Sequence, residues 1–152
     1  MLEGILMSVD RVLLSLIVGG MIIMAGCVRP LLIQQLTRKD NSEFSNLIEG
    51  LSINAWNRYN NLAFAATAVM LVLDIIRMAI GIKYTYWGLV LKAIILVLFF
   101  LKFTLDTSLK KRLLEYGNAA INSSEQKKGH HLVEMMSKGI LIFSVILTIL
   151  PY

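Results

Sequence analysis

Three charged residues lie inside stretches of the chain that are otherwise apolar: Asp74, Arg77 and Lys92. A charge inside a membrane-length apolar segment is costly unless it pairs with an opposite charge or meets water. Asp74 lies about nine residues before the centre of the turn at 83–85 and Lys92 about eight after it, so on two antiparallel helices both reach a similar depth. The spacing therefore predicts an ion pair between helices, with Arg77 sharing the carboxylate or extending outward to the interface.

Two interpretations of this group remain open. In the first, Asp74, Arg77 and Lys92 form a polar pocket for a proton, an ion or an anionic ligand, because charges within membrane segments often serve a function. In the second, they form a structural ion pair that fixes the register of two helices. Both interpretations predict that Asp74 and Lys92 are in contact.

A second charged group lies toward the opposite ends of the apolar stretches. Its members are Arg29, Lys102, Asp106, Glu134 and Lys138. Glu134 and Lys138 are four residues apart, so they are neighbours on one helix face. Arg29, Lys102 and Lys138 are candidates for binding the headgroups of anionic lipids, and the alternative is that these long side chains simply extend to the solvated interface.

The residue types that bind metals or perform nucleophilic catalysis are few. His130 and His131 are the only histidines, and as neighbours on a helix they point about 100° apart, so they are poorly placed to ligate one metal ion. They are nevertheless the candidates for a metal site or for the axial ligand of a haem. Cys27 is the only cysteine and is expected to be a packing residue. We predict no catalytic residues and no cofactor, with haem as the alternative.

The elements that must position these residues are expected to be membrane helices. The chain has 152 residues, of which 57% are hydrophobic, and its mean hydropathy is +0.69. Runs without charge are long enough to cross roughly 30 Å of hydrocarbon. We predict an all-α integral membrane protein of one domain, residues 1–152, with an up-down-up-down four-helix bundle. The predicted spans are 12–28, 62–82, 86–105 and 132–151.

Several helices are expected to continue beyond the bilayer on one side. Apolar spacing extends the second helix back to about residue 44 and the third forward to Tyr116. The predicted N-caps are Asp40, Asn41 or Ser42 for the second helix, and Ser123 or Ser124 for the fourth. Pro30 cannot donate to the carbonyl of Gly26, so a mild kink is expected near the end of the first helix.

The distribution of basic residues predicts an orientation. An even number of spans places both termini on one side and the connections 34–61 and 106–131 on the other, and most lysines and arginines lie on the side of the connections. The positive-inside rule then places these connections in the cytoplasm and both termini outside, in an inner or plasma membrane. The net charge of +5 is explained by this topology, so no nucleic-acid partner is expected.

The order of features resembles a family of four-helix membrane proteins of unknown function that includes transmembrane protein 205. The resemblance rests on Val18-Gly19-Gly20-Met21, Val28-Arg29-Pro30-Leu31-Leu32, Asn57-Arg58-Tyr59-Asn60 and a histidine that opens the fourth helix. It covers nearly the whole chain and implies a four-helix membrane fold.

A second resemblance is to small four-helix protoporphyrinogen oxidases and copper-resistance membrane domains. It rests on the segment Tyr86-Trp87-Gly88-Leu89-Val90-Leu91-Lys92, which is similar to the lysine-bearing third helix of the oxidases. This resemblance implies a membrane enzyme that handles haem or a porphyrin through Lys92.

From these observations we expect a protein without catalytic activity. It would serve as an accessory or scaffold subunit of a larger membrane complex, or bind lipid or a small ligand between its helices. The alternatives are a porphyrin-handling enzyme and the transport of a small ion by an oligomer. The expected partners are the lipid bilayer, other membrane subunits or further copies of the chain.

Overall fold

A computed structural model shows that the chain forms long helices. It describes residues 2–37, 42–82, 86–117, 119 and 123–150, and all regular structure in these ranges is helical. The elements are α1 (Leu2–Ile23), the π-helix η1 (Met24–Val28), α2 (Arg29–Thr37), α3 (Ser42–Ala79), α4 (Tyr86–Tyr116) and α6 (Ser124–Ile149). The predicted all-α class and the long second and third helices are confirmed.

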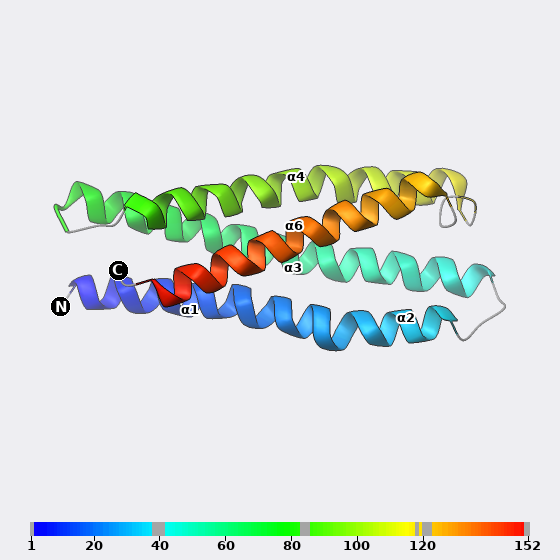
Figure 1. Cartoon of the computed structure of the whole chain (residues 1–152), viewed down its shortest axis with the longest axis horizontal. Helices are drawn as coiled ribbons and strands as arrows, with labels where there is room; N and C mark the ends of the chain where they lie inside the picture. The colour runs from blue at the N-terminus through cyan, green and yellow to red at the C-terminus, as the bar shows by residue number, and fades with distance from the viewer. Residues whose placement is uncertain (1, 38–41, 83–85, 118, 120–122, 151–152) are drawn as a thin grey trace.

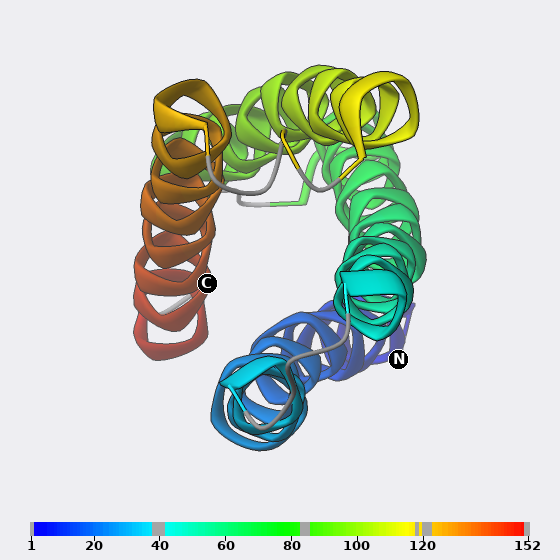
Figure 2. The ribbon, with the colours of Figure 1, turned by 90° about the vertical axis from the view of Figure 1, so that its right-hand side faces the viewer.

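The helices pack side by side along one long axis (Figure 1). Along the chain α1, η1 and α2 run in one direction, and both marked chain ends lie at the same end of the molecule. α3 packs against α1 and α4, and α6 closes the bundle by packing against both α4 and α1. Viewed down the axis, the helices form a ring, and at the near end α2 and the start of α6 lie apart (Figure 2).

Four helical stretches are long and apolar enough to cross a membrane, which indicates an integral membrane protein. They are Leu2–Leu32, Gly50–Ala79, Tyr86–Tyr116 and Ser124–Ile149. The first stretch begins ten residues before the predicted span, because the helix already starts at Leu2 and includes Asp10 among its buried residues. The helix thus begins before the predicted span 12–28, which lies within this stretch.

The local sequence explains how the helices end. Gly81 has φ +74°, and the Ile82 N–H donates to the Arg77 carbonyl at 3.0 Å, which closes the end of α3. Ser123 caps α6, since its Oγ accepts a hydrogen bond from the Gln126 N–H, and this confirms one of the two predicted caps. The proposed caps Asp40 and Asn41 lie outside the described residues, as do the turn at 83–85 and residue 151.

The disturbance predicted at Pro30 takes the form of a π-turn. Residues 24–28 are wound as a π-helix, and the Arg29 N–H donates to the Met24 carbonyl, five residues back. Proline has no N–H with which to continue the α-helical pattern, and π-turns inside long helices are often found at functional sites. This wider turn lies directly before Arg29, one of the candidate site residues.

The apolar core runs along the axis between the four long helices. Its fully buried members include Leu14 and Ile17 of α1, Met70 of α3, and Ile95 and Phe99 of α4. The buried positions of α1 and of α4 recur three or four residues apart, which is the spacing of the inward face of a helix in a bundle. Charged residues occupy the same inward helix faces on either side of this core along the bundle axis, and they form the two regions described next.

Candidate functional site

The first region is a buried cluster of four charges, which we call the Lys92 cluster. It consists of Asp10, Asp74, Arg77 and Lys92. Lys92 Nζ lies 2.8 Å from a carboxylate oxygen of Asp10 and 2.8 Å from one of Asp74, so the predicted pair between Asp74 and Lys92 is confirmed. All four side chains are almost completely removed from the surface.

The geometry of this cluster balances its charges. Lys92 Nζ is within 3.1 Å of both oxygens of Asp10 and within 3.0 Å of both oxygens of Asp74. Arg77 Nη1 lies 3.3 Å from Asp74 and 3.7 Å from Asp10. Two cations therefore face two carboxylates from α1, α3 and α4, which is the arrangement that makes a buried charge tolerable in a membrane. Arg77 shares the carboxylates, as one of its two predicted alternatives required.

Asp10 is the member of this cluster that sequence reasoning missed. It was assigned to a segment before the first span, yet it lies four residues before Leu14 on the stripe that continues through Ile17 and Met21. Those four residues are the buried positions described for α1. Extending that stripe by one helical turn would have predicted that Asp10 faces the bundle interior.

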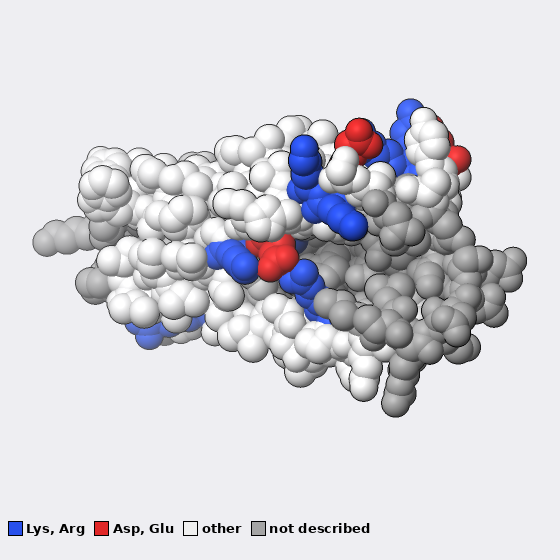
Figure 3. All heavy atoms as spheres, turned by 45° about the vertical axis from the view of Figure 1, so that its right-hand side comes forward, with Lys and Arg blue, Asp and Glu red and all other residues white. Residues whose placement is uncertain are grey.

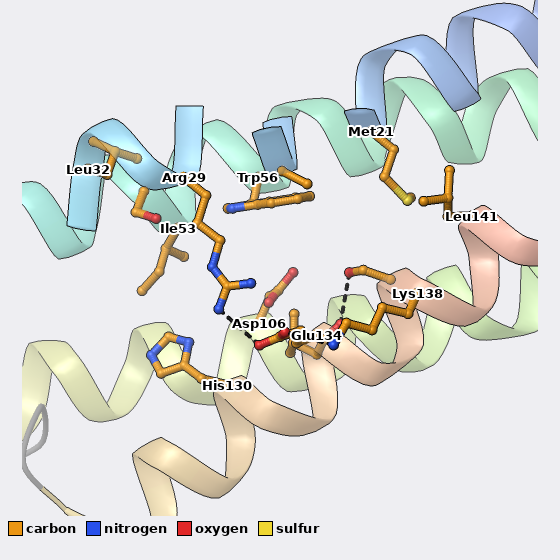
Figure 4. Close-up of a pocket in the computed structure, with 14 residues that line it drawn as sticks. Met21, Arg29, Leu32, Ile53, Trp56, Asp106, His130, Glu134, Lys138 and Leu141 are labelled. Atoms are coloured by element: carbon orange, nitrogen blue, oxygen red, sulfur yellow. Dashed lines mark hydrogen bonds and ion pairs between the residues drawn. The ribbon is translucent and has the colours of Figure 1, made fainter. Parts of the chain in front are cut away.

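The second region is a cavity of about 330 Å³ near the other end of the bundle (Figure 4). Its lining combines apolar side chains with charged and polar ones. The residues are Met21, Ala25, Arg29, Leu32, Ser52, Ile53, Trp56, Asp106, His130, Val133, Glu134, Ser137, Lys138 and Leu141. The volume is in the lower part of the range of small-molecule pockets, roughly 300–1,000 Å³. The face of the molecule in Figure 3 shows charged side chains gathered beside a hollow, whereas the opposite half of that face is nearly free of charge.

Three charged residues connect α2 and α6 beside the cavity, and we call them the mouth triad: Arg29, Glu134 and Lys138. Arg29 Nη2 donates to Glu134 Oε2 at 2.9 Å, and Lys138 Nζ lies 3.0 Å from Glu134 Oε1. Arg29 and Lys138 are substantially exposed, at 44% and 68% of the side chain. Two cations share one carboxylate, so the triad carries one positive charge in excess.

Behind the cavity lies a chain of buried polar groups, which we call the Lys102 chain: Asn60, Lys102, Asp106 and Ser137. Lys102 Nζ donates to Asn60 Oδ1 at 3.0 Å and to Ser137 Oγ at 2.7 Å. Asn60 Nδ2 in turn donates to Asp106 Oδ2 at 3.1 Å. Lys102 is fully buried, so its side chain does not extend to the solvated interface, which was one of the two interpretations of its position.

Trp56 connects the Lys102 chain with the cavity. Its ring lines the cavity, and Lys102 Nζ lies 4.8 Å from the ring centroid, which is a cation–π distance. In Figure 4, Asp106 lies between Trp56 and the Arg29–Glu134 pair. Sequence reasoning missed Trp56, Asn60 and Ser137, although Asn60 lies three residues before the buried Ala63 on the inward stripe of α3.

The two histidines differ in position. Both are exposed, but His130 lines the cavity, and its Nε2 lies 3.4 Å from Gln126 Nε2 one turn earlier on α6. Among the described residues no three histidine, cysteine or acidic side chains come together as a metal site. Cys27 is exposed rather than packed in the interior, because it lies on the outer side of the π-turn.

The structure thus brings Asp74, Arg77 and Lys92 together, and it brings Arg29 and Lys138 together at one carboxylate. The resemblances inferred from sequence motifs stay predictions, since no protein-family model, no curated protein and no solved structure matches the chain.

Proposed function

We propose that the protein is a membrane-embedded four-helix bundle that binds an amphiphile with an anionic group in the cavity, without catalysing a reaction. The single observation that carries this proposal is the lining of the cavity, where apolar residues from α1, α3 and α6 adjoin a triad with an excess positive charge. Arginine and lysine beside an apolar groove match the two chemical halves of a lipid.

The anionic group would bind to Arg29 and Lys138. Both side chains are partly exposed and already lie close to one carboxylate oxygen pair, so they can turn toward a phosphate or carboxylate without leaving Glu134 entirely. The chain of the amphiphile would contact Met21, Ile53 and Leu141. The cavity volume of about 330 Å³ suits a headgroup with the first part of one acyl chain rather than a whole two-chain lipid.

The proposed topology is up-down-up-down, with both termini outside and the long connections in the cytoplasm of an inner or plasma membrane. It is supported by Lys110, Lys111 and Arg112, which are near the cavity end of α4, and by exposed Tyr86 and Trp87 at its other end. Basic residues favour the cytoplasmic side, and exposed aromatic rings favour an interface. The cavity would then open in the cytoplasmic half of the bundle.

The alternatives have less support in the structure. Porphyrin handling by Lys92 needs an accessible lysine, whereas Lys92 Nζ is enclosed by two carboxylates. Transport of an ion needs a polar path, whereas Ile95 and Phe99, both fully buried, lie on α4 between Lys92 and Lys102. The role of an accessory subunit is compatible with ligand binding and is tested by copurification with other membrane proteins.

The fluorescence of Trp56 tests ligand binding directly. The chain has two tryptophans, so the W87F variant reports only on the ring that lines the cavity. This variant, purified in dodecyl maltoside, is titrated with a lysophosphatidylglycerol whose acyl chain carries bromine, which quenches nearby tryptophan. We expect saturable quenching at one lipid per protein, and at least tenfold weaker binding when Arg29→Met and Lys138→Met are combined.

The matched control is Lys111→Met, which removes an exposed lysine that pairs with Glu115 away from the cavity. It should leave the titration unchanged. Quenching that never saturates, or that is the same with and without Arg29 and Lys138, would contradict the proposed function.

A further inference from the structure

The charged groups around the cavity point to a more specific class of ligand. We infer that the cavity selects an amphiphile whose headgroup carries both charges, a phosphate bound by Arg29 and Lys138 and an ammonium bound by Asp106. This inference rests on the proposed function, since it concerns the ligand of the same cavity. Its headgroup chemistry is that of phosphoethanolamine.

The first step is the position of Asp106. Its carboxylate lines the cavity although only 6% of the residue is exposed. Among the described side chains, its direct hydrogen bond comes from the neutral amide of Asn60, and no lysine or arginine forms an ion pair with it. A buried carboxylate that faces a cavity and accepts its described side-chain hydrogen bond from a neutral amide, with Lys102 and His130 acting on it only electrostatically, is suited to accept a cationic group of a ligand.

The second step concerns Lys102, the nearest cation on the same helix. Its Nζ is directed to Asn60 Oδ1 and Ser137 Oγ, and Lys102 is not among the residues that line the cavity. Asn60 lies between the two charges, donating to Asp106 through Nδ2 and accepting from Lys102 through Oδ1. The amide thus holds Lys102 behind the wall and leaves the cavity side of Asp106 to the ligand.

The third step concerns Trp56. Its ring lines the cavity beside Asp106, and Lys102 Nζ lies 4.8 Å from the ring centroid, which helps to fix its orientation. Aromatic rings attract ammonium groups as well as acyl chains. An ammonium beside Asp106 would therefore meet a carboxylate and an aromatic ring, the combination used to recognise amines.

The fourth step is the separation of the two signs. Asp106 belongs to α4 and lies inside the cavity, whereas Arg29 and Lys138 belong to the mouth triad on α2 and α6 (Figure 4). The excess charge of the triad is one positive unit, which matches one phosphodiester. An anion without an amine would satisfy the triad and leave Asp106 facing apolar carbon, so it should bind less well.

The test compares headgroups on one acyl chain. W87F protein in dodecyl maltoside is titrated with brominated lysophosphatidylethanolamine and with brominated lysophosphatidylglycerol, which share the phosphate and differ in the ammonium. We expect the ethanolamine lipid to bind at least tenfold more tightly. Asp106→Asn should remove this preference while the glycerol lipid still binds, and Glu115→Gln, an exposed carboxylate on the same helix, should keep it.

A change in the ligand provides an answer that does not depend on the folding of the variant. N-acetylation of the ethanolamine removes its positive charge, and the acetylated lipid should bind no better than the glycerol lipid. If both lipids saturate with equal affinity, or if Asp106→Asn retains the preference, the inference is wrong although the proposed function stands. If neither lipid saturates, the proposed function itself fails.

A further titration separates a lipid from a free headgroup. Water-soluble glycerophosphoethanolamine, which has no acyl chain, is added as a competitor to the bound ethanolamine lipid. We expect displacement only at concentrations at least a hundredfold higher than those of the lipid itself, because the soluble compound lacks the contacts with Met21, Ile53 and Leu141. Equally effective displacement would overturn the assignment of an amphiphile.

Discussion

Lys92 and Lys102 lie ten residues apart on the same inward stripe of α4, and both are fully buried, yet their surroundings differ. Lys92 Nζ meets four oxygens of two carboxylates. Lys102 Nζ meets neutral oxygens of Asn60 and Ser137, and it faces Asp106 only through the amide of Asn60. The first lysine pairs directly with two carboxylates, and the second lies behind a cavity.

This difference distinguishes a group of charges that pair with one another inside the bundle from charges that, in the proposed function, would contact a ligand. In the Lys92 cluster the two cations and two carboxylates neutralise one another across three helices, which fixes their register. Around the cavity, no described ion pair joins Asp106 of α4 to Arg29 or Lys138, and these two cations share the carboxylate of Glu134. The partly exposed pairs that Arg29 and Lys138 form with Glu134 contribute little to stability, so either cation could contact a ligand instead of Glu134 at little cost in free energy.

The largest loss of stability is expected when the Lys92 cluster is disrupted. Lys92→Met removes the cation that contacts both Asp10 and Asp74 and leaves one arginine to face two buried carboxylates. Removing one partner of a buried ion pair costs about 3–5 kcal/mol of stability. Unfolding of the purified protein by sodium dodecyl sulfate, followed by circular dichroism, should show this loss.

The matched double variant combines Lys92→Met with Asp74→Leu. It leaves Asp10 and Arg77, one charge of each sign, which already lie 3.7 Å apart. The double variant should therefore lose less stability than Lys92→Met alone. Equal losses from the single and the double variant would mean that Asp74 and Lys92 do not stabilise each other.

The same substitution at the second lysine provides the direct comparison. Lys102→Met leaves Asn60 Oδ1 and Ser137 Oγ without the donor that they share. Leaving these two neutral acceptors without a hydrogen bond should lower the free energy of unfolding by about 2 kcal/mol. The loss in the same unfolding assay should be smaller than for Lys92→Met, since no direct ion pair is broken. A loss as large as that of Lys92→Met would show that the two lysines have equivalent surroundings.

A smaller effect is expected where the helices approach each other between the two regions. A Cβ on Gly20 would lie 2.7 Å from the ring of Tyr59, whose hydroxyl donates to the Ile17 carbonyl at 2.7 Å. Gly20→Ala should therefore cost about 1 kcal/mol, because the ring must shift and strain that hydrogen bond. Gly19→Ala is the control, since nothing lies within 4 Å of its added carbon. Equal stability of the two variants would contradict this close approach.

The fold could be predicted from the sequence largely because the bilayer restricts the choices. Long uncharged runs predict helices, and apolar spacing correctly extended the second helix toward residue 44 and the third to Tyr116. The start of the first helix could not be set in the same way, because Glu3 and Asp10 read as a polar segment before a span. The spacing of Asp10 from Leu14 and Ile17 indicates the face on which it lies, but its partner Lys92 is 82 residues away, and no local pattern identifies that partner.

The site was predicted in part for a related reason. Depth along antiparallel helices is set by the rise per residue, so Asp74 and Lys92 could be matched across a single turn. The cavity could not be predicted, because its lining combines side chains from separate helices, such as Arg29, Trp56, Asp106 and His130, whose juxtaposition no local pattern contains. Lys102 was a candidate for binding lipid headgroups or for extending to the interface, and its acceptors inside the bundle, Asn60 and Ser137, come from two other helices that the sequence pattern did not connect with it.

The smallest effect on stability is expected at the mouth of the cavity, and it sharpens the comparison most. Arg29→Met breaks the ion pair with Glu134, but both side chains are partly exposed and Lys138 still neutralises the carboxylate. Such pairs contribute about 0–1 kcal/mol, so unfolding should change little. Binding of the brominated lipid should nevertheless weaken severalfold, because a cation that contacts the anion is lost.

Glu134→Gln should change the stability equally little but have the opposite effect on binding. The anion should bind more tightly, because it no longer competes with a carboxylate for Arg29 and Lys138. If these variants lowered the free energy of unfolding as much as they changed lipid binding, the mouth triad would have a structural role like that of the Lys92 cluster, and the comparison would be wrong.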